Sequence, residues 1–216
     1  MARIAFSGKM ASGKSTTAKH LMDEYGYVKT CMAAVMKEIE QIQATQHPEM
    51  WHTELRPWLE LIVPKTNMMS GSVRSEVGQW IVRLMRKIPS TPGEKNRDFL
   101  QALGNGLREF HHEDVWVNTV ITSMGNMDNV VIDDIRYPNE IERLREEGFI
   151  IVRLNVSEEV QKARYKEEYG SIEGIDFEHP GEIALDNYDD YDYVIDADIS
   201  IEELHEKVDE IVAEVS

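Results

Sequence analysis

The chain has 216 residues, of which 42% are hydrophobic, and this favours a folded α/β domain with a sizeable core over a disordered chain. The formal net charge is −17, unevenly distributed: residues 1–110 carry +4 and residues 111–216 carry −21. Because a phosphate backbone rewards basic surface, we do not expect nucleic acid as a partner. The single cysteine fits a reducing cytoplasm (the host cytoplasm if the source is viral), and the short apolar start predicts neither a signal peptide nor a membrane partner.

The first half of the chain predicts one strand and then several helices. Residues 3–7 are typical of a short buried strand. A helix is expected from about 13 to 25, with Leu21 and Met22 on its inner side and Gly26 at its end. Apolar spacing and breaking residues predict further helices, the second of them interrupted by Pro57, over 33–44, 49–62, 72–88, 95–109 and 114–124.

The second half alternates strands with helices. A strand over 129–132 is expected to be closed by Asp133 and Asp134, and residues 169–181 are glycine-rich and predict a mobile loop. Ser200 and Glu203 form a capping box at the start of the last helix. The remaining elements are helices over 138–147 and 157–168 and strands over 149–154 and 192–196. This order predicts a parallel sheet with an all-helical insertion.

A P-loop pattern follows the first strand in full: Gly8-x-x-x-x-Gly13-Lys14-Ser15. Glycines let the backbone wrap around phosphate oxygens, the lysine reaches the β- and γ-phosphates, and the hydroxyl binds Mg²⁺. The following helix places its positive end at the anion. An ordinary glycine-rich turn is the alternative. The candidate ATP-binding residues of the loop are Gly8, Ala11, Ser12, Gly13, Lys14 and Ser15.

A P-loop also needs a carboxylate from a neighbouring strand end to hold the metal. We assign Asp133 to Mg²⁺ together with Ser15, and the adjacent Asp134 to a supporting or substrate-binding role. A carboxylate that caps the strand is the alternative for Asp133. The seven histidines show no metal-binding spacing, and Cys31 has no partner pattern, so we expect neither zinc nor covalent catalysis.

Arginines near the carboxyl end of the sheet are candidates for phosphate binding. Arg136 could grip an acceptor phosphate bidentately, with a surface ion pair as the alternative. Glu140 could contact the acceptor, although helix-start chemistry is the favoured interpretation there. Arg164 leads into the 169–181 loop and could neutralise the transferring phosphoryl group, or it could pair with Glu168. Lys9 is an additional cation that could supplement or replace it.

The helical insertion offers three further acceptor candidates. Lys37 and Arg108 are each more typical of surface charges when considered alone. Trp116 could stack on a base, but a tryptophan in an apolar helix usually belongs to the core.

Taken together, these segments resemble the P-loop nucleoside monophosphate kinases, and more narrowly the bacteriophage-type deoxynucleoside monophosphate kinases. The similarity lies in RDFLQALGNGLRE (97–109), DVWVN (114–118), VVIDDIRYPNE (130–140) and HPGEIALDNYDDYDYVID (179–196). Before the glutamate of the last segment, where the family often has serine, this chain has Gly181.

The resemblance implies transfer of the ATP γ-phosphoryl group to a deoxynucleoside monophosphate, with Lys14, Ser15 and Thr16 holding ATP and Mg²⁺. It implies one kinase domain whose five-stranded parallel core (1–30 and 128–216) has helices on both faces, with a helical acceptor-binding insertion (31–127) and a lid (165–182). The partners would be small nucleotides, and a homodimer is left open. By position the resemblance assigns Arg136 to the acceptor phosphate and Lys37 to the acceptor side. Together with the candidates from the residues themselves, the expected acceptor-binding residues are Lys37, Arg108, Trp116, Asp134, Arg136 and Glu140.

Other functions remain open at this point. A related kinase could act on another small phosphorylated acceptor, such as dephospho-coenzyme A or phosphomevalonate. A P-loop ATPase or a non-catalytic nucleotide-binding regulator is also compatible with the loop. No Asn-Lys-x-Asp guanine signature occurs, and the four intact residues Lys14, Ser15, Asp133 and Arg136 argue against a non-catalytic relic.

Overall fold

The computed structural model describes residues 2–64 and 70–215, and within them five strands form one all-parallel sheet. The strand order is β2-β3-β1-β4-β5, so β1 lies at the centre between β3 and β4. The strands are β1 (Arg3–Gly8), β2 (Val28–Thr30), β3 (Val130–Ile135), β4 (Phe149–Asn155) and β5 (Tyr193–Asp196). The carboxyl ends of parallel strands meet at one edge of a sheet, which is where ligands bind in open α/β folds.

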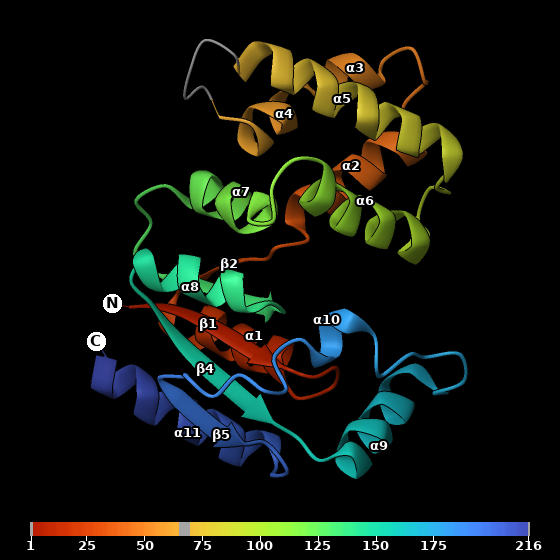
Figure 1. Ribbon diagram of the computed structural model, residues 1–216. Helices are drawn as coiled ribbons and strands as arrows, with labels where there is room; N and C mark the ends of the chain where they lie inside the picture. The colour runs from red at the N-terminus through yellow and green to blue at the C-terminus, as the bar shows by residue number, and fades with distance from the viewer. Residues whose placement is uncertain (1, 65–69, 216) are drawn as a thin grey trace. The chain divides into compact units, whose positions relative to one another are not determined.

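Helices cover both faces of this sheet, as the sequence predicts (Figure 1). On one face, α1 (Lys14–Tyr25) and α11 (Ile201–Val215) share a buried core with β1 and β4, which includes Leu21 of α1, Val208 of α11 and Phe6 of β1. On the other, α8 (Pro138–Glu146) packs on β4 with Ile141 and Leu144 fully buried. The architecture is that of a P-loop nucleoside monophosphate kinase-like fold.

Two elements of the sheet differ from the sequence-based expectation. The strand predicted to close at Asp133 continues as β3 to Ile135, because the ladder with β1 resumes after an irregularity between Ala5 and Ser7. The edge strand β2 was not predicted: it has three residues, and Val28 and Lys29 are exposed, so it lacks an apolar pattern. Outside the sheet, Met22 of α1 also differs from the expectation: it was expected to face inward, but it is 40% exposed.

Residues 169–181, predicted as a loop, lead from α9 (Glu158–Tyr169) into the short helix α10 (Pro180–Ile183). Phe177 packs edge-to-face on the buried ring of Tyr165, with ring centroids 5.7 Å apart. The segment is therefore anchored to α9 by an aromatic contact.

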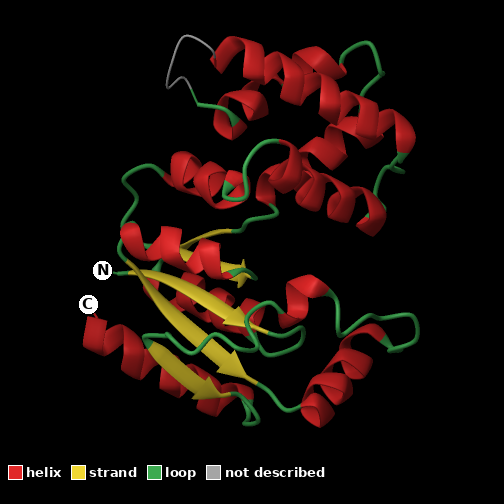
Figure 2. Cartoon of the chain, in the orientation of Figure 1, coloured by secondary structure: helices red, strands yellow, loops and turns green. Residues whose placement is uncertain are grey.

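The chain divides into two compact units, the sheet unit (Met1–Cys31 and Asn126–Ser216) and the helical unit (Met32–Gly125). Among its described residues, the helical unit contains helices and loops only (Figure 2). Its helices are α2 (Ala34–Thr45), α3 (Trp51–Glu54), α4 (Arg56–Ile62), α5 (Ser70–Lys87), α6 (Arg97–Phe110) and α7 (Val115–Met124).

Packing and hydrogen bonds to the backbone join the helices of this unit. A Cβ atom on Gly106 of α6 would lie 2.5 Å from the indole of Trp80, so these helices approach closely where the side chain is absent. The predicted 49–62 helix is divided at Leu55 into α3 and α4, and Pro57 occupies the first turn of α4, where proline is tolerated.

None of the described helices is long and apolar enough to cross a membrane.

Candidate functional site

The loop between β1 and α1 has the backbone of a phosphate cradle. Gly8 and Gly13 have φ values of 154° and 98°, which side chains rarely adopt. A Cβ atom on Gly8 would also lie 2.7 Å from the carbonyl oxygen of Leu154. Ala11 has a φ of 57°. Among the described residues it is the only non-glycine residue with a positive φ. The loop is thus held in a strained form, typical of functional backbone.

Lys14 stands at the first position of α1 and folds back over the loop. Its Nζ donates to the carbonyl oxygens of Gly8 and Lys9, both at 2.6 Å. Burial, followed by the positive charge of Arg136, lowers the pKa of the Lys14 ammonium from 10.5 to about 7, while Asp133 acts in the opposite direction. A poorly solvated cation of this kind gains strongly from a nearby phosphate.

Ser15 and Asp133 form the expected pair. The Ser15 Oγ donates to Asp133 Oδ2 at 2.8 Å, and the aspartate is 6% exposed. Hydroxyl and carboxylate oxygens are hard ligands of the kind Mg²⁺ prefers, and such sites complete their coordination with water and substrate phosphates. The residues present therefore fit a Mg²⁺ ion at this position.

Lys29 of β2 also binds Asp133, with Nζ 2.5 Å from the same Oδ2 atom. Sequence reasoning missed this lysine because it missed the strand that carries it. The ammonium neutralises a carboxylate that is almost fully buried.

Glu140 shapes the turn between β3 and α8. Its carboxylate is 1% exposed and accepts hydrogen bonds from the backbone N–H groups of Arg136 (2.8 Å) and Tyr137 (3.2 Å). This is the helix-start role that the sequence favoured, and a contact with the acceptor stays a prediction. Asp134 is half-buried and lies next to Asp133 in β3, so its side chain alternates to the other side of the strand.

Arg136 follows β3 and binds Glu182 of α10. The arginine Nη1 donates to the carboxylate of Glu182 and, at 3.2 Å, to the carbonyl of Gly181. Glu182 also accepts a hydrogen bond from the Met10 N–H of the P-loop at 2.9 Å. Glu182 was not predicted, because an acid in a short polar segment gives no local signal of its long-range partners.

Lys9 takes part in a second set of ion pairs. Its Nζ lies 3.1 Å from Asp186, and the other oxygen of that aspartate lies 3.8 Å from Arg153 of β4. Arg153, which is 8% exposed, was not singled out from the sequence.

Arg164 of α9, predicted as a lid cation, donates from Nη2 to the carbonyl oxygen of Ile199 at 2.7 Å. In this arrangement it fastens α9 to the segment before α11. A role toward the transferring phosphoryl group would require it to leave that partner, and it stays a prediction.

Three predicted acceptor residues belong to the helical unit. Trp116 of α7 is 1% exposed, and its Nε1 donates to the carbonyl of Gly104 at 2.9 Å. The indole is therefore part of the core, the interpretation that its apolar helix favoured, and stacking on a base would require it to be uncovered. Arg108 of α6 donates to the same carbonyl at 3.4 Å, and Lys37 lies on α2.

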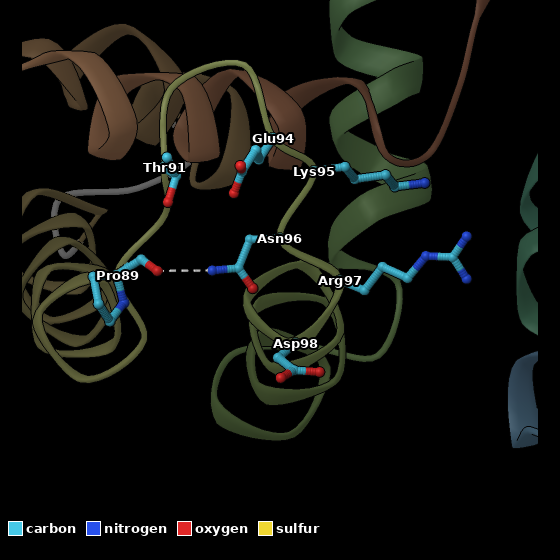
Figure 3. A pocket seen from close by; sticks show the side chains of 7 residues that line it. All are labelled: Pro89, Thr91, Glu94, Lys95, Asn96, Arg97 and Asp98. Atoms are coloured by element: carbon cyan, nitrogen blue, oxygen red, sulfur yellow. Dashed lines mark hydrogen bonds between the residues drawn. The ribbon is translucent and has the colours of Figure 1, made fainter. Parts of the chain in front are cut away.

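The helical unit also has a polar cavity of about 380 Å³ at the start of α6 (Figure 3). Asn96 caps this helix: its Oδ1 accepts a hydrogen bond from the Phe99 N–H. Its Nδ2 donates to the carbonyl oxygen of Pro89. The lining residues are Pro89, Thr91, Glu94, Lys95, Asn96, Arg97 and Asp98. None of the residues predicted for ATP, Mg²⁺ or the acceptor lines it.

The chain is similar in sequence to a viral protein. No family model matches the chain. The chain is 24% identical over 222 residues to an Acanthamoeba polyphaga mimivirus protein named "Putative deoxynucleotide monophosphate kinase". The similarity covers 96% of this chain and 94% of that protein, and so includes both units. It supports a kinase.

Proposed function

We propose that the chain is a deoxynucleoside monophosphate kinase, which transfers the γ-phosphoryl group of ATP to a deoxynucleoside monophosphate to give the diphosphate and ADP. One observation carries the proposal: Lys14, the hydrogen-bonded pair Ser15–Asp133 and Arg136 all belong to one end of the sheet unit. The named similarity to the viral protein supports the acceptor class.

In this proposal the P-loop amides and Lys14 bind the β- and γ-phosphates of ATP, with Gly8, Gly13 and Thr16 in the same loop and helix start. Ser15 and Asp133 would hold Mg²⁺, which when bound offsets negative charge on the phosphates. Arg136 binds the phosphate of the acceptor. Its Nη1 is engaged by Glu182 and Gly181, and its Nε and Nη2 atoms form the edge that neither contact uses.

Phosphoryl transfer requires little covalent chemistry from the protein. Most of the rate comes from aligning the two substrates and neutralising charge. Exclusion of water matters because water would otherwise accept the phosphoryl group, and we assign this task to the lid, residues 165–182. The proposed partners are ATP, Mg²⁺ and small nucleotides.

The test is ADP formation from ATP and Mg²⁺ with each of the four common deoxynucleoside monophosphates, with their ribose forms and without acceptor. The expected result is turnover that depends on a deoxynucleotide acceptor. Equal ADP formation without acceptor would instead identify a P-loop ATPase. Turnover with dephospho-coenzyme A or phosphomevalonate alone would identify a kinase of another small acceptor.

A further inference from the structure

Glu182 connects two segments that the proposed reaction uses for different substrates. Glu182 is 8% exposed. Its two carboxylate oxygens have different partners: one accepts a hydrogen bond from the Met10 N–H of the P-loop, and the other binds Arg136. In Figure 1, α10, which carries this residue, lies beside the end of β1. One buried carboxylate therefore touches both the proposed ATP loop and the arginine assigned to the acceptor.

The contacts of Arg136 with α10 orient its guanidinium and do not occupy the edge that would bind a phosphate. Both contacts with α10 come from Nη1, to Glu182 and to the Gly181 carbonyl. A guanidinium presents five N–H donors in a rigid fork, so anchoring at one nitrogen fixes the direction of the remaining edge. That edge, formed by Nε and Nη2, can form the paired bonds that bind a phosphate.

Gly181 lies against Arg136, although this contact does not itself require glycine. A Cβ atom there would lie 3.5 Å from Arg136 Cδ and 3.5 Å from the Tyr137 hydroxyl, which is ordinary contact. The arginine side chain thus lies directly against the backbone of α10, with the buried acid next to it in sequence. An unpaired buried carboxylate would be costly, so the pair is expected to persist in the folded protein.

Asp186, four residues further on, extends the same arrangement. It binds Lys9 of the P-loop and lies 3.8 Å from Arg153 of β4. Two acids of one short segment therefore contact three separate parts of the site: the P-loop, the residue after β3, and β4.

We propose that Glu182 is a positioning residue that fixes Arg136 and the P-loop in one arrangement, so that the acceptor phosphate and ATP are bound in register. This inference rests on the proposed function for its acceptor half. Its P-loop half concerns nucleotide binding alone and can be measured without turnover.

The experiment compares Glu182→Gln, Arg136→Ala and the double variant with the wild type. Glu206→Gln, an exposed acid of α11 outside the lid, is the matched control. The readouts are KM for the deoxynucleotide acceptor, KM for ATP, the dissociation constant of ADP by calorimetry and the midpoint of thermal unfolding.

Glu182→Gln should raise the acceptor KM by about tenfold or more, as expected for loss of a charged hydrogen bond. It should weaken ADP binding by a smaller factor, about threefold, through the Met10 contact. Adding Glu182→Gln to Arg136→Ala should change the acceptor KM little further, because both variants remove one interaction. Glu182→Asp, which keeps the carboxylate, should give an acceptor KM between those of the wild type and Glu182→Gln.

Acceptor KM values in Glu182→Gln that match the Glu206→Gln control, effects that add in the double variant, or a lowered acceptor KM would each overturn the proposal. The last result would show that Glu182 inhibits Arg136. If the wild type turns over no acceptor, the proposed function fails by itself. Positioning of the P-loop is then decided by ADP affinity: weakening in Glu182→Gln supports it, and unchanged affinity overturns it.

Discussion

The sheet unit and the helical unit use their interior polar groups in different ways. In the sheet unit, charged and polar side chains gather around the P-loop: Asp133 contacts Ser15 and Lys29, and Lys14 donates to carbonyls of the loop. In the helical unit, polar side chains bind the backbone: Gln43 donates to the carbonyls of Met85 (2.5 Å) and Ile88 (2.6 Å). Groups of the first kind can be redirected to a charged ligand, whereas those of the second kind complete the fold.

We therefore expect the chemistry to take place in the sheet unit and the interior polar groups of the helical unit to have a structural role. Variants at the two places should therefore separate activity from stability, and the largest effect is expected at the P-loop lysine.

Lys14→Ala should lower kcat/KM by about a thousandfold or more, because it removes the cation that reaches the transferring phosphoryl group. The measurement is steady-state ADP formation with the best acceptor, together with thermal unfolding to show that the variant is folded. Lys19→Ala on the same helix is the control, since that side chain is 72% exposed and pairs with Asp23. A loss of less than tenfold in Lys14→Ala would contradict the account.

A matched pair of loop variants tests whether the backbone itself is the phosphate site. Gly8→Ala should cost about 2–4 kcal/mol of stability and most nucleotide binding, because its Cβ would clash with the Leu154 carbonyl. Ala11→Gly should be neutral or stabilising by up to about 1 kcal/mol, because φ is 57° there. Chemical denaturation and ADP calorimetry measure both, and equal effects at the two positions would refute the argument.

Trp116→Phe tests the structural assignment within the helical unit. The variant loses the donor to the Gly104 carbonyl and should lower the free energy of unfolding by about 1–3 kcal/mol. The order of preference among the four deoxynucleotide acceptors should stay the same. A changed base preference at unchanged stability would show instead that the indole stacks on the acceptor.

The pKa of Lys14 predicts a pH dependence of nucleotide binding. At a pKa of about 7 the free ammonium loses its proton as the pH rises, while a bound phosphate favours the charged form. ADP binding above pH 7 should then take up a proton, and the affinity should fall by up to about tenfold per pH unit. Calorimetry at pH 8 in buffers of different ionisation enthalpy measures the uptake, and its absence would contradict the prediction.

The same group affects stability with the opposite sign. Because the folded pKa lies below the usual 10.5, the unfolded chain binds more protons between about pH 7 and 10.5. The contribution of Lys14 to the free energy of unfolding should therefore increase as the pH rises through this window.

Local signals explain how much of this molecule could be predicted. The P-loop has fixed spacing, and short, compact apolar runs identified β1, β3 and β4, so the fold class followed from residues near each other in sequence. The edge strand β2 lacks such a run, and Lys29 was lost with it.

Long-range pairs gave no comparable signal. Glu182, Asp186 and Arg153 lie in segments that reach the P-loop only in the folded chain, so sequence spacing could not connect them. Trp116 shows the converse: an aromatic residue that could stack on a base is equally suited to a helical core, and here its side chain is buried. Arg164 likewise donates to the carbonyl oxygen of Ile199, a contact that its spacing in the sequence did not indicate.

The most direct test of the central claim follows the transferred group itself. ATP labelled at the γ-phosphorus is mixed with enzyme, Mg²⁺ and one deoxynucleoside monophosphate, and the labelled products are separated over time. The account predicts that label appears in the deoxynucleoside diphosphate at the rate of ADP formation, and that Lys14→Ala abolishes the transfer. Label that appears in inorganic phosphate at the same rate with or without acceptor would contradict it.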